Sequence, residues 1–259
     1  MNFDNDVEIK KRALKLCEYY ESWGLDCIEQ YDKEVKSLNE QEIIILMNTI
    51  KILNNKYFDW FFMLFGILLQ VVCFILTGDS ILSFICGLSG VINVVLCSQR
   101  KLSFYLFAYI QMFTYIIIIF QQHLYGELIE NIFYVITTTI ALFIWIKNYN
   151  KEEKQVEAKK LTKKQLIIYC IVFIISTILL YTILLMTNDP KPFLDSISTV
   201  PAFIAQFLLM FRYREQWIMW LIVDIATLIL WISIGNIFMI MQYIFWILNC
   251  IYGFVKWSK

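Results

Sequence analysis

Eight long apolar stretches constrain this chain more than any other feature of its sequence. They lie at 57–76, 80–98, 102–120, 126–146, 166–186, 194–211, 215–232 and 237–255. Each is close to the ~20 residues that an α-helix needs to cross the hydrocarbon core of a bilayer. Backbone polar groups inside hydrocarbon must be bonded within the segment, so runs of this length form helices. The sequence therefore predicts an all-α, polytopic membrane helix bundle with eight spans.

The distribution of charge agrees with this fold class. Charged residues make up 17% of the chain, and they gather in residues 1–56, in the central connection and in the short links between apolar stretches. A globular domain would disperse them. The charged start predicts no cleavable signal peptide, and we expect residues 1–56 to form a cytoplasmic segment with amphipathic helices at Val7–Glu21 and Gln41–Leu53. The seven cysteines form no CxxC pair, which favours free thiols over disulfides or a metal site.

Basic residues mark every second connection. They are Arg100 and Lys101, seven lysines between 147 and 164, Arg212 and Arg214, and Lys256 and Lys259. The other four connections (77–79, 121–125, 187–193 and 233–236) contain a single basic residue, Lys191. Because basic connections stay in the cytoplasm, this alternation predicts a multi-pass protein of the cell membrane with both termini cytoplasmic.

An internal repeat follows from motifs in two pairs of spans. The third and seventh spans share two aromatic residues and a polar residue at the same spacing, as Phe104-x2-Phe107-x3-Gln111 and Trp217-x2-Trp220-x3-Asp224. The fourth and eighth spans both end in a tryptophan that follows a small residue, as Ala141-x3-Trp145 and Gly253-x3-Trp257. Three helices reverse the direction of the chain, so one joining helix gives two such units the same orientation. Parallel repeats of this kind occur in transporters.

The predicted organisation is therefore 3+1+3, with one extra span in front. After the segment 1–56 and the extra span 57–77, the first three-helix repeat covers 80–146. A basic loop and linker span follow at 147–187, and the second repeat covers 194–257.

Trp217, Trp220 and Asp224 lie at i, i+3 and i+7, on one face of the seventh span. A carboxylate in mid-bilayer costs about 2.5–3.5 kcal/mol on the scale of helix insertion, so it is expected to face a cavity or a partner group. Indole faces attract flat cations. This face predicts the binding site of a small solute in a membrane transporter. Three alternatives stay open: Trp217 as an interfacial anchor, Asp224 as a structural hydrogen-bond acceptor, and Asp224 in its protonated form.

Amides in other spans are further candidates for substrate binding. Gln111 and Asn131 can both donate to and accept from an amide or sugar group. Gln242 is a weaker candidate, together with Gln206 and Asn249. Hydrogen bonding between helices is the alternative use of such amides in a membrane bundle, and it is favoured for the weaker three.

Other classes of function lack their motifs. Asp224 is the single clear mid-span carboxylate, whereas an aspartyl protease needs two. The sequence has no HExxH motif, which argues against a metalloprotease, and no P-loop, which argues against an ATP-driven pump. Its one histidine, His123, argues against a histidine-rich metal site. We therefore expect no catalytic residue, no resident metal or cofactor, and no nucleic acid partner. A receptor or scaffold that transports nothing stays open.

These motifs resemble those of the PnuC family of bacterial vitamin transporters. The resemblance covers roughly 80–257. Its residues are Trp217, Trp220 and Asp224 with the preceding Glu215, Leu124-Tyr125-Gly126-Glu127 followed by Asn131, and Asp195-Ser196. It implies uptake of nicotinamide riboside by facilitated diffusion across a bacterial cell membrane. It also implies a cytosolic kinase that traps the substrate by phosphorylation, and a homotrimer.

Two departures from the family pattern concern presumed substrate contacts. The family often has asparagine where this chain has Asp224, and relatives often carry an amide in the region of Thr137–Thr139. Thiamine, another nucleoside or a flavin therefore stays open as the substrate.

Overall fold

The computed structural model describes residues 55–78, 80–121, 123, 125–187, 190–235 and 237–258. The helices predicted at Val7–Glu21 and Gln41–Leu53 lie outside these ranges. Within them, Trp60–Trp257 fold as one unit.

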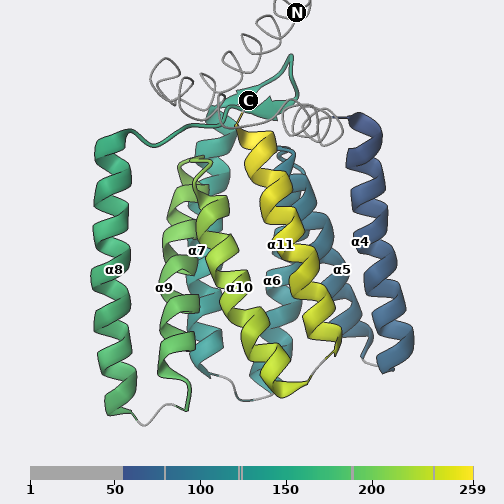
Figure 1. Ribbon diagram of the computed structural model, residues 1–259. Coiled ribbons are helices and arrows are strands. Elements are labelled where there is room, and N and C mark those ends of the chain that lie inside the picture. Colours follow the sequence, from purple (N-terminus) through teal and green to yellow (C-terminus); the bar gives the residue numbers. More distant parts are fainter. Residues whose placement is uncertain are drawn as a thin grey trace, which may run out of the picture. The chain divides into compact units, whose positions relative to one another are not determined.

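Eight helices run up and down in this unit, side by side (Figure 1). They are α4 (Lys56–Thr77), α5 (Ile81–Ser98), α6 (Phe104–Gln121), α7 (Tyr125–Lys147), α8 (Lys163–Met186), α9 (Pro192–Met210), α10 (Gln216–Ile234) and α11 (Ile237–Trp257). All eight are long and apolar enough to cross a membrane. The prediction of a polytopic all-α bundle is confirmed, and the predicted ends agree with the helix ends within three residues.

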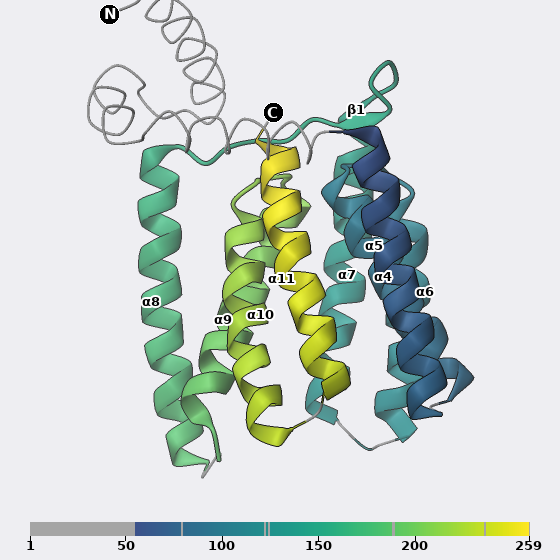
Figure 2. The ribbon, with the colours of Figure 1, turned by 45° about the vertical axis from the view of Figure 1, so that its right-hand side comes forward.

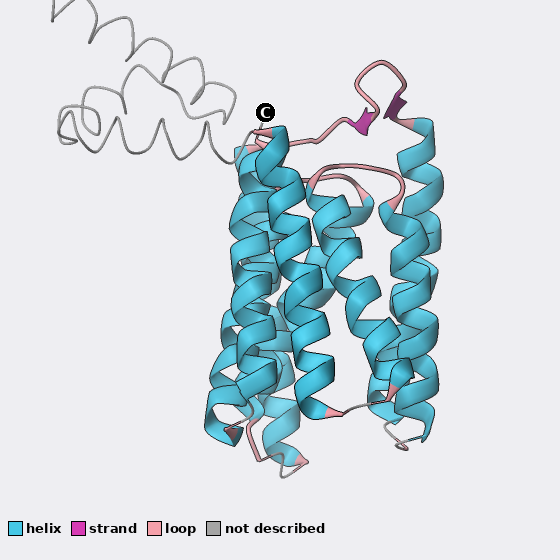
Figure 3. Ribbon diagram, turned by 90° about the vertical axis from the view of Figure 1, so that its right-hand side faces the viewer, coloured by secondary structure: helices cyan, strands magenta, loops and turns pink. Residues whose placement is uncertain are grey.

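A short hairpin in the connection between α7 and α8 was not predicted. Its strands β1 (Tyr149–Asn150) and β2 (Gln155–Val156) pair antiparallel. The turn forms because the Asn150 side chain accepts hydrogen bonds from the backbone N–H groups of Glu152 and Glu153, at 2.9 and 3.2 Å. The hairpin lies beyond one end of the helices (Figures 2 and 3), which we call the hairpin end.

The chain that leaves the hairpin ties two helix ends together. Val156 donates its backbone N–H to the carbonyl of Arg100, just after α5, at 3.0 Å. Lys159 donates in the same way to Arg212, just after α9, at 2.7 Å. Both arginines have a left-handed backbone, with φ of 58° and 66°. The two turns are therefore alike, and one segment bonds to both.

Two tryptophans join the central helices crosswise. Trp145, at the end of α7, donates its indole N–H to the carbonyl of Leu209 in α9, and Trp257, at the end of α11, donates to Cys97 in α5; each bond is 3.1 Å long. Their ring centroids are 5.6 Å apart, and both residues are buried. Each set of three helices, α5–α7 and α9–α11, therefore ends in an indole that bonds to the first helix of the other set.

Two helices stand at the edges of the bundle, α4 and α8 (Figure 1). On α4, Phe62 stacks on Phe245 of α11 with ring centroids 5.0 Å apart. On α8 no residue is buried. The outward faces of both helices are apolar, as contact with lipid requires.

Candidate functional site

The six central helices enclose a cavity of about 310 Å³. This volume is at the small end of the range of ligand pockets, about 300–1,000 Å³. Every helix from α5 to α7 and from α9 to α11 contributes to it. The lining residues are Asn93, Val94, Cys97, Phe104, Ala108, Gln111, Met112, Tyr115, Asn131, Tyr134, Thr138, Gln206, Leu209, Gln216, Trp217, Trp220, Asp224, Trp246, Asn249 and Cys250.

Most of the residues predicted for the site meet in this cavity. Trp217, Trp220, Asp224, Gln111 and Asn131 all line it, although they come from three different helices. Gln242 is not among the lining residues. It lies one helical turn before Trp246, the first α11 residue of the lining, and is half-buried.

Asp224 borders the cavity and is 5% exposed. One carboxylate oxygen accepts a hydrogen bond from the thiol of Cys250, at 3.2 Å. A thiol is a weak donor, and none of the described residues that line the cavity is basic. A carboxylate in these surroundings favours a ligand that brings a positive charge or hydroxyl groups.

Trp217 is held firmly at one wall. It is 4% exposed, and its ring lies edge-on to Trp257, with centroids 5.9 Å apart and an interplanar angle of 81°. A Cβ added at Gly253 would lie 2.5 Å from its ring, so glycine is needed there for the indole to fit. The burial of Trp217 differs from that of an interfacial anchor, whose ring reaches the headgroups. Trp220, one turn further along α10, is half-buried and also borders the cavity.

The amides of the lining connect helices as well as facing the cavity. The Gln111 side-chain oxygen accepts from the Asn93 amide at 3.1 Å, which links α6 to α5. Gln206 donates from α9 to the hydroxyls of Thr137 and Thr138 in α7, both at 3.0 Å. Two hydroxyls of the threonine run Thr137–Thr139 are therefore bonded to an amide of another helix.

Several buried polar atoms around this cavity have no hydrogen-bond partner within the described part of the chain. They are Asn93 Oδ1, Asn131 Oδ1, both polar side-chain atoms of Gln216, Trp217 Nε1, Trp246 Nε1 and Asn249 Oδ1. Buried polar groups are normally bonded, and all of these belong to lining residues. A polar ligand in the cavity would supply the missing partners.

The sequence did not predict Asn93, Gln216 or Trp246 as residues of the site. Asn93 stands alone in an apolar run, and a lone amide at such a place is itself a signal of function. Gln216 precedes Trp217 and resembled the polar start of a helix. Nothing in the sequence marked Trp246, because it belongs to neither motif of the repeat.

These features define a class of protein: a multi-pass membrane protein with a ligand cavity between its helices, as in solute transporters. A sequence model of a family described as nicotinamide mononucleotide transporter matches residues 80–259. The chain belongs to this family.

Relatives with a related name and a solved structure agree with this assignment. The nicotinamide riboside transporter PnuC of Haemophilus influenzae is 31% identical over 79% of this chain and 91% of its own length. The protein of the same name from Neisseria mucosa is 30% identical over 77% of this chain and 80% of its own. A crystal structure of the vitamin B3 transporter PnuC superposes with a TM-score of 0.68 at 28% identity, covering 79% of this chain and 92% of that one. The resemblance to the PnuC family is thereby confirmed.

Proposed function

We propose that this protein takes up nicotinamide riboside across a bacterial cell membrane. One observation carries the proposal: a cavity bordered by one carboxylate, by indoles and by unpartnered amide atoms, with no basic residue among its described lining residues. Nicotinamide riboside is a flat aromatic cation with a carboxamide and sugar hydroxyls, so it offers each of these groups a partner. The relatives named above are transporters of this compound.

The same lining argues against the mononucleotide in the family's description. A phosphate group adds two negative charges, and its recognition normally uses arginine, lysine or a helix N-terminus. Asp224 would repel it at close range in a medium of low dielectric constant. The riboside is therefore the better substrate for this cavity.

Five of the predicted site residues have a role in this proposal. Trp217 and Trp220 contact the pyridinium ring, with a cation–π attraction of about 0.5–2 kcal/mol. Asp224 balances the ring charge or accepts hydrogen bonds from the ribose. Gln111 and Asn131 bind the carboxamide or the sugar. Gln242 has no role in it, because it does not line the cavity.

The repeat organisation belongs to the same proposal. We infer that α5–α7 (within 80–146) and α9–α11 (within 194–257) are parallel repeats joined by α8, with α4 as the extra span. Two observations support this inference: the crosswise hydrogen bonds of the two indoles, and the similar left-handed turns at Arg100 and Arg212. The basic connections lie at the hairpin end, which we therefore assign to the cytoplasm.

Transport by facilitated diffusion completes the proposal, with trapping by a cytosolic kinase and a homotrimeric assembly. Counterflow in liposomes without ion gradients tests the mechanism. Labelled nicotinamide riboside should exchange against the unlabelled riboside and should not be competed by the mononucleotide. An obligatory proton or sodium gradient would overturn the uniport mechanism, and equal competition by the mononucleotide would overturn the substrate assignment.

Thiamine is a second candidate, favoured by the Asp224 carboxylate beside two indoles, since thiamine is also an aromatic cation. A melting-temperature panel on the purified protein separates the candidates. Nicotinamide riboside should raise Tm more than thiamine or neutral nucleosides at equal concentration. A larger rise with thiamine would replace the proposed substrate and leave the transporter class unchanged.

A further inference from the structure

A second hollow, of about 500 Å³, lies between α8 and α9, away from the central cavity. Its lining is almost wholly apolar. It consists of Tyr169, Val172 and Ser176 on α8 and Val200, Phe203, Ile204, Phe207 and Phe211 on α9. We propose that this α8–α9 groove binds one acyl chain of an anionic phospholipid, with the lipid phosphate at the lysines of the hairpin end.

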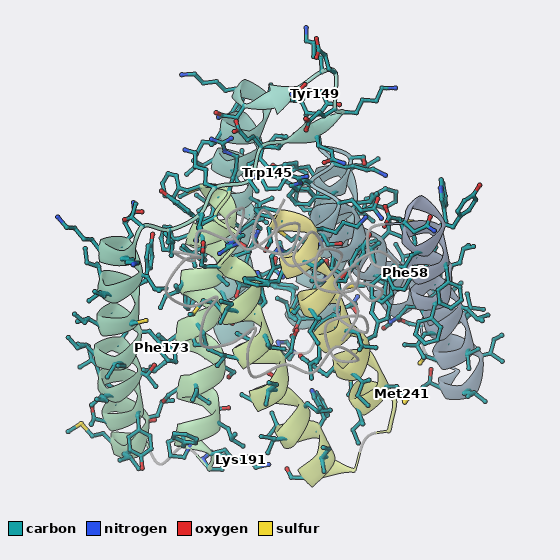
Figure 4. All side chains as sticks on the ribbon, turned by 45° about the horizontal axis from the view of Figure 1, so that its top comes forward. Phe58, Trp145, Tyr149, Phe173, Lys191 and Met241 are labelled. Atoms are coloured by element: carbon teal, nitrogen blue, oxygen red, sulfur yellow. The ribbon has the colours of Figure 1, made fainter. Side chains whose placement is uncertain are left out.

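Helix α8 packs against α9 and against the turn that follows α9. At the hairpin end, Gln165 donates to the Tyr213 hydroxyl at 3.4 Å. At the other end, Tyr181 and Phe193 meet edge-on with ring centroids 6.4 Å apart. Between them, Phe173 (Figure 4) packs against a small cluster that includes buried side chains of α9.

Two of the three α8 positions that line the groove, Val172 and Ser176, hold small side chains, which leave the space beside them unfilled. An empty apolar space forfeits dispersion contacts along its walls. A flexible alkyl chain from the surrounding bilayer restores those contacts, and it needs no hydrogen-bond partner.

The length of the groove fits one leaflet. Its α9 wall extends from Val200 to Phe211, and eleven residues of helix rise about 16 Å. Half of a bilayer core of about 30 Å is nearly the same length. The Phe211 end lies at the hairpin end of α9, so the groove accepts an acyl chain from the leaflet on that side. A transmembrane helix from a second copy of the chain crosses both leaflets, so it would need a groove about twice as long.

Positive charge gathers where the headgroup would lie. Four lysines lie just before and at the start of α8: Lys159, Lys160, Lys163 and Lys164. Burial lowers the pKa of Lys160, nearby Arg214 and Lys163 lower it further, and Glu215 opposes them. Glu215 is already engaged, by Arg214 at 3.2 Å and by the backbone N–H of Leu161 at 3.2 Å. An anionic phosphate would relieve the repulsion among these cations. Basic pockets between membrane helices bind the headgroups of acidic lipids in this way.

Native mass spectrometry of the full-length protein in mild detergent tests the proposal. Phosphatidylglycerol and phosphatidylcholine with identical acyl chains are added separately. One phosphatidylglycerol should stay bound per protein, at least about tenfold more tightly than phosphatidylcholine. The double variant Lys160→Gln/Lys163→Gln should lose most of this preference. Its matched control, Lys151→Gln/Lys154→Gln in the hairpin turn, removes the same charge and should keep the preference.

A second pair of variants tests the apolar part of the site. Ser176→Phe fills the groove and should abolish retention of the lipid, whereas Ile175→Phe adds a ring to the exposed neighbouring position and should not. Equal binding of the two lipids, equal loss in both lysine variants, or unchanged retention by Ser176→Phe overturns the proposal. The proposal is also overturned if the wild-type protein retains no lipid and Ser176→Phe instead disrupts an oligomer. The groove would then be an interface between copies of the chain. If Ser176→Phe fails to fold by size-exclusion chromatography, the lysine variants decide alone. Lipid retention is measured without substrate, so a wrong substrate assignment leaves this result unaffected.

Discussion

Helices α6 and α10 carry the same spacing of residues but border the cavity with different chemistry. Near their starts, Phe104 lies against Trp145 and Trp217 lies edge-on to Trp257, with ring centroids 5.0 and 5.9 Å apart. Further along, α6 offers Gln111 where α10 offers Asp224. The contacts that hold the two helices in place are therefore similar, but of these two helices only α10 brings a carboxylate and indoles to the cavity.

The two polar residues also differ in how well they are satisfied. Gln111 accepts a hydrogen bond from the Asn93 amide at 3.1 Å, and Asp224 accepts one from the weaker thiol donor of Cys250 at 3.2 Å. The middle aromatic residues differ as well. Both are half-buried against the hydrophobic core, but Trp220 also lines the cavity and Phe107 does not. If α10 provides most of the binding energy, substitutions on α10 should cost more than the matched substitutions on α6.

The largest effect is expected for Asp224→Ala. Loss of one partner from a buried charged contact costs about 2–5 kcal/mol, so the affinity for nicotinamide riboside should fall at least thirtyfold. Gln111→Ala removes a neutral group and should cost about 0.5–1.5 kcal/mol. Isothermal titration calorimetry on the purified variants measures both. A larger loss of affinity for Gln111→Ala than for Asp224→Ala would show that α6, and not α10, provides most of the binding energy.

Gly253→Ala comes next, because its Cβ would lie 2.5 Å from the Trp217 ring. In the sequence repeat the corresponding position holds Ala141, which accompanies the smaller ring of Phe104. Overpacking of this kind costs about 1–3 kcal/mol, so Tm and riboside affinity should both fall.

A double variant separates this steric effect from a general defect of folding. Trp217→Phe should restore most of the Tm lost by Gly253→Ala, since it recreates the pair of residues found in the first repeat. It should not restore riboside affinity, because the indole is gone. Additive losses in Tm would show that the two positions do not compete for space.

A smaller effect is expected for Trp220→Ala. The indole borders the cavity, and the loss of its attraction for a cationic ring costs about 0.5–2 kcal/mol, which corresponds to a twofold to thirtyfold weaker affinity. Phe107→Ala is the matched variant on α6. It should lower Tm by removing packing against the core while leaving riboside affinity within about twofold of wild type. Equal losses of affinity from both variants would contradict a ligand contact that Trp220 makes and Phe107 does not.

The sequence predicted the helices well because the membrane makes their formation a local matter. Twenty apolar residues must be helical there, whatever they pack against. The motif Trp217-x2-Trp220-x3-Asp224 likewise defines one helix face on its own, and that face borders the cavity.

What the sequence did not predict depends on partners far along the chain. The hairpin segment is positioned by bonds from Val156 and Lys159 to the ends of two other helices. Gln216 and Asn93 count as site residues only because helices packed around them leave a cavity there. The spacing of residues along a helix also does not show how far along its axis the cavity extends. Gln242 lies four residues before Trp246 and so shares its face, but it lies beyond the cavity by one turn.

The smallest effect is therefore expected for Gln242→Ala. Its side chain does not line the cavity, and a half-buried polar residue without a ligand contact changes affinity little. Riboside affinity should stay within about twofold of wild type, since substitutions away from specific contacts are usually within 0.5 kcal/mol. Asn249→Ala is the matched variant two turns further along α11, where the side-chain oxygen is buried and has no partner among the described residues. It should weaken binding by about 0.5–1.5 kcal/mol. If Gln242→Ala weakens binding as much as Asn249→Ala, the ligand extends one turn further along α11 than this cavity does.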